Sequence, residues 1–139
     1  MYLPATFPAL ARLRDRGELA APEGYAVTPA LRAQLGEDDE EQLAYEAFQL
    51  AAEASLRLLR ADPAAARRRV VVAADAPVAP AGEGGVVTLA APVPLAAVAA
   101  VHVDGRAAEP AVTRAAAGDG TVEDELEWFD VSELAQLLD

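Results

Sequence analysis

The segment DDEEQLAYEAFQLAAEASLRLLRA, residues 38–61, is the longest regular pattern in the chain. Asp38 followed by Glu41 is typical of a helix capping box, and the acids at residues 37–41 suit the positive end of a helix dipole. Polar side chains within the segment recur every three or four residues, which on a helix places them in one narrow stripe. This stripe comprises Gln42, Glu46, Gln49, Glu53, Arg57 and Arg60.

Apolar side chains fill the rest of this helix, about two thirds of its circumference, whereas a helix packed on one sheet face needs a stripe of only about 100°. We therefore predict that the helix is contacted on more than one side. Either other helices of the same subunit flank it, which we favour, or part of it forms the seam of a homodimer.

Two shorter helices are predicted upstream of this segment. Thr6 and Thr28 are each followed by a proline within two residues, which is typical of a helix N-terminus. Gly17 and Gly36 predict where these helices end. A short apolar run precedes each Thr and predicts a strand.

Downstream, the β-branched run Val70–Ala74 predicts a central strand. Further strands are predicted at residues 86–91, 99–104 and 125–129. Asp130, with Glu133 three residues later, predicts the capped start of a final helix. The alanine-rich residues 107–120 are either a weak helix or a mobile loop.

These elements predict an α+β fold. A chain of 139 residues suits one domain, so we expect a single domain spanning residues 1–139. The predicted order of strands and helices along the chain favours a mixed sheet of five or six strands, with the helices packed mainly on one face.

The composition excludes several classes of chemistry. The chain has no Cys and one His, which removes disulfides, thiolate zinc sites and any site that needs two imidazoles in one subunit. It has no Lys, so it lacks the phosphate-binding lysine of a P-loop and a Schiff-base lysine. We therefore expect no cofactor.

The charge balance bears on partners. Eleven Arg against 23 Asp and Glu give a net charge of -12, which repels a polyphosphate backbone, so we expect no nucleic-acid ligand. The first twenty residues hold no continuous apolar stretch of the signal-peptide kind, and the longest apolar run, residues 86–101, is interrupted and too short for a bilayer. We expect a cytoplasmic protein with no membrane partner.

His102 and Asp104 are the candidate catalytic pair. They lie two residues apart on a predicted strand, so their side chains share one face about 6.6 Å apart, at ~3.3 Å per residue. The pair suits a general base, but the alternative is an imidazole on the solvent side of an edge strand, with Asp104 starting a turn. Ser132 would complete a triad, although no nucleophile elbow surrounds it.

Three carboxylates form a candidate metal set. Asp75, Asp104 and Asp130 each follow or end a predicted strand, where oxygen ligands suit Mg²⁺. The alternative is that each Asp starts a turn. The glycines of residues 82–85 suggest a phosphate loop only weakly, because no helix N-terminus follows them, and a hairpin explains them better.

Aromatic side chains are the candidate binding residues. Tyr45 and Phe48 lie on the long helix and Trp128 on the last predicted strand, and large aromatic residues are enriched at protein interfaces. If Trp128 were exposed beside Tyr25 or Tyr45, it would indicate a protein-binding patch.

Arg68 is a further candidate binding residue, because Arg67–Arg69 is the only dense basic run in an acidic chain. Such a run can hold an anion or the carboxylates of a partner. The alternative is that these side chains pair with the acids of residues 37–41 or stay solvated where a strand begins.

Several blocks together resemble a known family. They are YLPAT and PAL (residues 2–6 and 8–10), YAVTPALR (25–32), ASLRLL (54–59), RRRVVVAAD (67–75), PVPLAAVAAVHVD (92–104) and ELEWFDVSEL (125–134). The chain resembles a family of short, acidic, uncharacterised actinobacterial proteins, a domain of unknown function. The resemblance implies a cytoplasmic protein and supplies no activity, cofactor or site residue.

The sequence thus predicts a non-enzymatic binding or interaction protein. Its expected partner is another protein, or a second copy held through the long helix. The alternative is a small hydrolase or carboxylate-metal enzyme that uses His102, Asp104 and Asp75.

Overall fold

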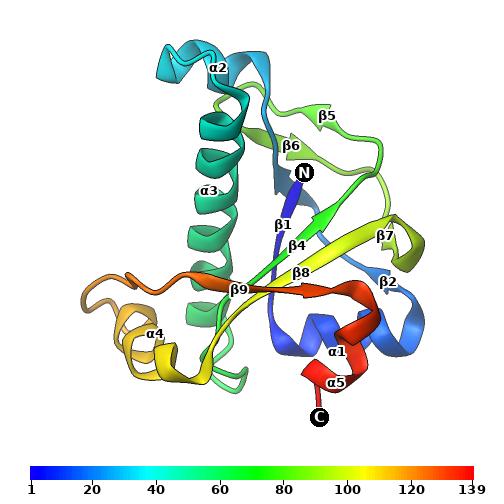
Figure 1. Cartoon of the computed structure of the whole chain (residues 1–139), viewed down its shortest axis with the longest axis vertical. Helices are drawn as coiled ribbons and strands as arrows, with labels where there is room; N and C mark the ends of the chain where they lie inside the picture. The colour runs from blue at the N-terminus through cyan, green and yellow to red at the C-terminus, as the bar shows by residue number, and fades with distance from the viewer.

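A seven-stranded sheet forms the centre of the molecule in the computed structural model, which describes residues 1–139 (Figure 1). Its strand order is β5-β6-β3-β1-β4-β8-β9, and every neighbouring pair is antiparallel. The strands are β1 (Tyr2–Ala5), β3 (Glu23–Tyr25), β4 (Val70–Ala74), β5 (Ala79–Pro80), β6 (Val86–Thr88), β8 (Val98–Asp104) and β9 (Leu126–Asp130). A separate pair joins β2 (Glu18–Leu19) to β7 (Val93–Pro94).

Five helices surround the sheet: α1 (Phe7–Arg16), α2 (Pro29–Leu35), α3 (Glu40–Ala61), α4 (Glu109–Ala116) and α5 (Leu134–Leu137). Short 3₁₀ turns precede β8, α4 and α5, at Leu95–Ala97, Arg106–Ala108 and Val131–Glu133. No helix combines the length and the apolar character that crossing a membrane requires.

The central strand β4 is buried on both sides. Val70 and Val72 pack in one cluster with Leu10 of α1 and Leu134 of α5, whereas Val71 packs in a second cluster with Leu43 of α3. Successive side chains of a strand point to opposite faces, so α1 and α5 cover one face of the sheet and α3 the other. The valines of β4 are β-branched and fully buried, which suits a strand enclosed between two layers.

Helix α3 stands along one side of the molecule (Figure 1). Asp39 caps it by accepting a hydrogen bond from the main-chain N–H of Glu41, one residue later than the predicted cap. Its apolar side chains pack on the sheet, and near its C-terminal end Leu59 packs against Val112 of α4. The prediction that this helix is contacted on more than one side is confirmed, and of its large apolar side chains only Tyr45 and Leu58 are exposed.

The α+β fold class is confirmed, with three differences in detail. The sheet has seven strands rather than five or six, its pairs are all antiparallel rather than mixed, and helices cover both faces rather than mainly one. Strand β5, whose two residues have no periodicity of their own, was not expected. Residues 109–116 form a helix, which settles the two alternatives for the alanine-rich segment.

Candidate binding site

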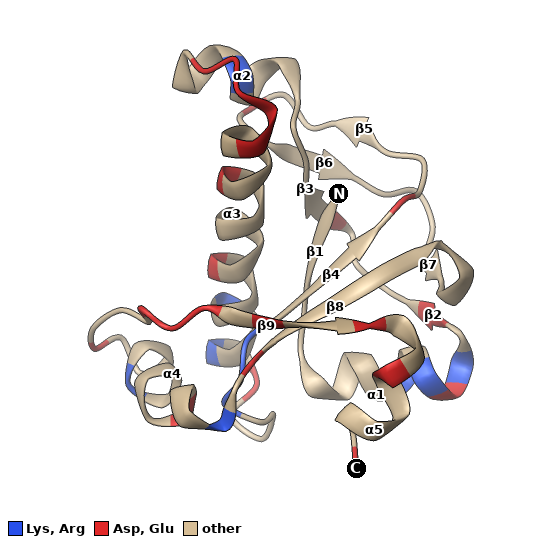
Figure 2. Cartoon of the chain, viewed as in Figure 1, with Lys and Arg blue, Asp and Glu red and all other residues tan.

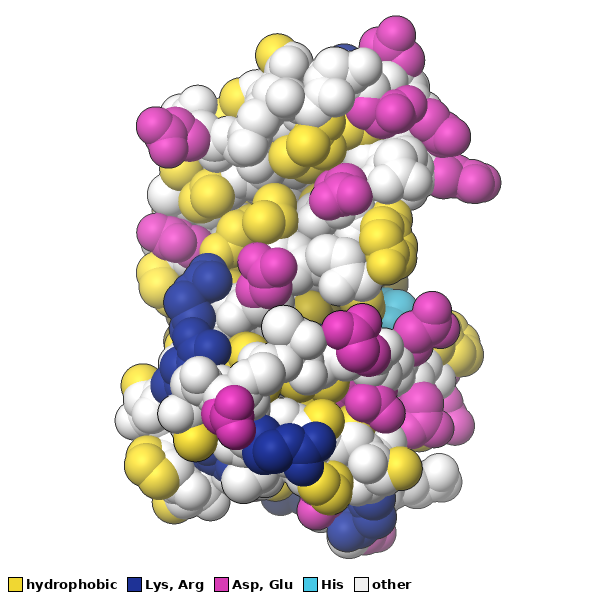
Figure 3. All heavy atoms as spheres, turned by 90° about the vertical axis from the view of Figure 1, so that its left-hand side faces the viewer, with side chains coloured by type: hydrophobic (Ala, Val, Ile, Leu, Met, Phe, Trp, Pro, Cys, Tyr) yellow, Lys and Arg dark blue, Asp and Glu magenta, His cyan; other side chains and the backbone are white.

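A hollow of about 580 Å³ lies between α3 and the strands β8 and β9. In Figure 3 the single histidine of the chain lies in a recess bordered by hydrophobic and acidic side chains. The lining residues come from β1, from the N-terminal half of α3, from β8, and from the start of β9 with the segment that leads into it. They are Tyr2, Glu41, Ala44, Tyr45, Phe48, Gln49, His102, Val122, Glu123, Asp124, Glu125 and Leu126.

Three rings pack edge to face in this hollow. The centroid of Phe48 lies 5.5 Å from that of Tyr2 and 4.9 Å from that of His102. Edge-to-face pairs of this kind are favourable and fix the orientation of each ring. Burial lowers the pKa of His102 below its ordinary value of 6.5, so the imidazole is neutral at pH 7.

Four carboxylates surround these rings. Glu41 lies in the first turn of α3, and Glu123, Asp124 and Glu125 lie in the segment before β9 (Figure 2). None of the four forms an ion pair, and no Arg is among the residues that line the hollow. The hollow therefore carries an unneutralised negative charge.

Two exposed aromatic side chains lie at this site. Tyr45 lines the hollow and is 55% exposed, and Trp128 on β9 is 60% exposed. Trp128 is paired in register with His102, so the two side chains leave the sheet on the same face, about 5 Å apart at their Cβ atoms. Tyr45, Phe48 and Trp128, the three aromatic residues predicted to bind a partner, thus converge on one surface.

Strand β9 forms one edge of the sheet. The main-chain N–H of Asp104 donates to Arg69 O, so the main-chain groups of Asp104 and, two residues earlier, His102 face β4. Their partners across the β8–β9 pair, Leu126 and Trp128, therefore turn their main-chain groups away from β8. These groups point outward from the edge, next to the hollow that Leu126 helps to line.

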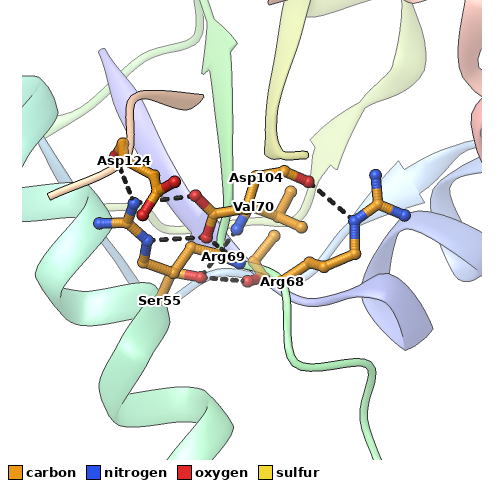
Figure 4. Close-up of polar contacts among 7 residues, drawn as sticks. Ser55, Arg68, Arg69, Val70, Asp104 and Asp124 are labelled. Atoms are coloured by element: carbon orange, nitrogen blue, oxygen red, sulfur yellow. Dashed lines mark hydrogen bonds and ion pairs between the residues drawn. The ribbon is translucent and has the colours of Figure 1, made fainter. Parts of the chain in front are cut away.

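Asp104 lies in a buried network (Figure 4) and is not among the residues that line the hollow. Its carboxylate accepts two hydrogen bonds from the Arg69 guanidinium and one from the Arg69 main-chain N–H, each 2.8 Å long. The same guanidinium donates to Asp124 O at 2.9 Å, which ties the segment before β9 to β4. Asp104 is fully buried with its oxygens occupied, so it is not free to serve His102 as a catalytic partner.

The arginine run is structural. Arg67 donates to main-chain carbonyls at the end of α3, including Leu59 O at 2.9 Å. Arg68 donates to Asp104 O at 2.7 Å, and its guanidinium lies over the ring of Phe7, 4.8 Å from the centroid. Neither predicted alternative describes this arrangement, in which all three side chains bind the start of β4 to neighbouring segments.

The candidate metal ligands are not brought together. Asp75 follows β4 four residues beyond Val71, the partner of His102, so the two lie about 13 Å apart along the sheet at ~3.3 Å per residue. Asp130 caps the last 3₁₀ turn, and its carboxylate accepts hydrogen bonds from Ser132. No group of three His, Asp or Glu side chains is placed to hold a metal ion.

The glycines of residues 82–85 belong to the hairpin between β5 and β6, as the hairpin alternative predicted. A Cβ at Gly85 would lie 2.9 Å from Ala26 O, so the close approach of these two segments requires glycine there.

Comparison with known proteins gives one match. A family model described as a family of unknown function, DUF6912, matches residues 1–138. No curated protein and no solved structure matches the chain.

Proposed function

The chain belongs to this family of unknown function, and we propose that it is a non-enzymatic binding protein that takes a segment of a partner protein at the hollow between α3 and β8–β9. The observation that carries the proposal is the convergence of Tyr45, Phe48, His102 and Trp128 on one surface that has a hollow of about 580 Å³. Exposed tyrosine and tryptophan side chains are the usual anchors of protein interfaces.

The free edge of β9 favours a peptide as the ligand. Its outward N–H and C=O groups, at Leu126 and Trp128, can pair with the main chain of an added strand. An added strand would run alongside the hollow, where its side chains meet the aromatic surface. A small ligand without a peptide main chain could not form these strand-to-strand hydrogen bonds.

Another protein is a better partner than a second copy. The apolar surface of α3, which motivated the homodimer hypothesis, is used mainly within the subunit. Two copies would bring together net charges of -12 each, and the acids before β9 would face one another across a β9–β9 contact. We expect the purified chain to sediment as a monomer of 14.4 kDa.

We favour this function over the enzyme alternative, because the residues of that alternative do not share one site. Of its three residues, His102 lines the hollow, Asp104 is held by Arg69 and Asp75 lies outside the hollow. We propose that the protein is cytoplasmic, because disulfides are rare in the cytoplasm and a chain without Cys forms none.

The test uses a random-peptide display library selected on the full chain. Selected clones are then measured on a Tyr45→Ala/Trp128→Ala variant and on a matched Leu58→Ala/Leu95→Ala variant, which removes exposed apolar side chains elsewhere. We expect the first variant to weaken binding at least tenfold and the second to leave it unchanged, with both folded by circular dichroism. Clones that bind the first variant as well as the wild type would overturn the proposal.

A further inference from the structure

We propose that the hollow holds the guanidinium group of an arginine side chain carried by the partner segment. This inference rests on the proposed function and adds the chemical identity of the group that is recognised. It follows from the lining, which combines packed aromatic rings with carboxylates that no cation of this chain neutralises.

The carboxylates define the charge of the ligand. Glu41 lies on the α3 wall of the hollow and Glu123, Asp124 and Glu125 on the β9 wall, so a cation placed between the walls is attracted from both sides. All eleven basic residues of the chain are Arg, and none of them lines the hollow. A positively charged ligand would therefore balance the negative charge of these carboxylates, which no basic residue of the chain balances.

The rings define the shape of the ligand. Arginine is the cation most often stacked on aromatic side chains, because its guanidinium is planar and weakly hydrated, and its fork can also bind a carboxylate through two hydrogen bonds. A bare metal ion is a poorer fit, since no three acidic or imidazole groups here are placed to coordinate one. An aromatic floor of Phe48 and Tyr2 between acidic walls suits a planar organic cation better.

The edge of β9 defines the source of the cation. Leu126 lines the hollow with its side chain and turns its main-chain groups outward from the edge. A partner strand paired there is within reach of the hollow for a side chain as long as arginine. Free small cations would gain nothing from that pairing, so a peptide should bind more tightly than a free cation.

The experiment titrates two synthetic pentapeptides into the ¹⁵N-labelled full chain and follows amide and ring shifts. The first peptide is acetyl-Val-Thr-Arg-Thr-Val-amide, and the second carries citrulline, the uncharged near-isostere, in place of arginine. We expect the arginine peptide to bind at least tenfold more tightly, with shifts at His102, Leu126 and Trp128. Equal affinity of the two peptides, or shifts that avoid these residues, would overturn the inference.

Matched charge variants locate the binding. Glu41→Gln/Glu125→Gln removes one carboxylate from each wall, and Glu53→Gln/Glu127→Gln removes one exposed carboxylate from α3 and one from β9 outside the hollow. We expect the first variant to lose at least fivefold in affinity for the arginine peptide and the second to lose less than twofold. Equal losses would mean a general effect of negative charge and would overturn the site.

Two further results distinguish a peptide from a free cation, and a failure of this inference from a failure of the proposed function. Spermidine is expected to bind at least tenfold more weakly than the arginine peptide, and tighter spermidine binding would refute the peptide source. If the library selection yields clones that depend on Tyr45 and Trp128 yet lack arginine, the proposed function stands and this inference fails. If no clone depends on those residues, the proposed function itself fails.

Discussion

The side chains of Asp104 and Arg69 are each more than nine-tenths buried, so the charge of each is compensated by the other rather than by water. Removing one partner of a buried ion pair leaves an uncompensated charge, which costs about 3–5 kcal/mol. Asp104→Asn should therefore lower the free energy of unfolding by about that amount. Urea denaturation followed by circular dichroism measures the change.

A double variant that also removes the charge of Arg69 is the control for this prediction. In Asp104→Asn/Arg69→Met the amide oxygen still accepts the main-chain N–H of residue 69, and no unpaired charge remains in the interior. We expect the double variant to be more stable than Asp104→Asn alone. A double variant that is less stable would show that the arginine contributes mainly through its other contact, to Asp124 O.

His102 should make stability depend on pH. Its pKa in the folded chain is lowered by burial, so as the pH falls below 6.5 the unfolded chain takes up the proton first. The folded state therefore loses stability as the pH falls through this window, down to the lowered pKa. His102→Phe keeps a ring against Phe48 and removes the titration.

The measurement for His102 is the difference in unfolding free energy between wild type and His102→Phe, taken from about pH 7.5 to pH 5. Relative to the variant, the wild type should lose stability as the pH falls. The N-terminal amine also has its pKa lowered by burial, but both proteins share that group, so it cancels. A difference that stays constant across this range would contradict the assignment.

At the scale of elements, Ser55 joins three parts of the fold. Its hydroxyl on α3 donates to Ala5 O of β1 at 2.8 Å and accepts from the main-chain N–H of Val70 of β4 at 2.9 Å. Ser55→Ala would leave both buried groups without a partner, at a cost of about 2–4 kcal/mol. Thr113→Ala removes an exposed helix hydroxyl and should change stability by less than about 0.5 kcal/mol. Thermal and urea unfolding of both variants would check the contrast, and equal effects would contradict it.

Sequence identified the elements whose signals are local. Val70–Ala74 is bounded as predicted, Thr28 caps α2 by accepting the N–H of Leu31, and Asp130 with Glu133 forms the predicted capping box. Each of these depends on residues within four positions of one another. Thr6 occupies its predicted cap position, with Pro8 in the first turn of α1, but its side chain makes no hydrogen bond to the helix.

What sequence missed depends on distant partners. Strand β7 exists because Val93 and Pro94 pair with β2, more than seventy residues earlier, and neither strand has a pattern of its own. In the same way, alternation placed His102 and Asp104 on one face correctly but gave no sign that Arg69, 35 residues away, would enclose the carboxylate. Of the acids at residues 123–125, the sequence places only Glu125, at the start of a predicted strand. That all three line the hollow depends on where α3 lies, which no local pattern indicates.

At the scale of the whole molecule, the chain carries a net charge of -12, and acidic residues recur along α3 and along β9 with the segment before it (Figure 2). Such a charge destabilises the compact state by self-repulsion, and salt screens it. Only two exposed ion pairs, Arg14–Asp15 and Arg32–Glu40, would be weakened by the same screening, and exposed pairs contribute little. Repulsion should therefore dominate, so salt should stabilise the fold.

Raising NaCl from about 0.01 M to 1 M shortens the screening length from about 30 Å to 3 Å. We expect the Tm to rise by about 3–6 °C, which corresponds to about 1 kcal/mol for a domain of this size. A variant in which the exposed acids Asp38, Glu83 and Asp119 become amides should start from a higher Tm and respond less, because it carries less charge to screen. Binding of the arginine peptide should weaken over the same salt range, since attraction between opposite charges is screened as repulsion is. A Tm that falls with salt would mean that attractive pairs, rather than the excess of acids, govern the electrostatics of the fold.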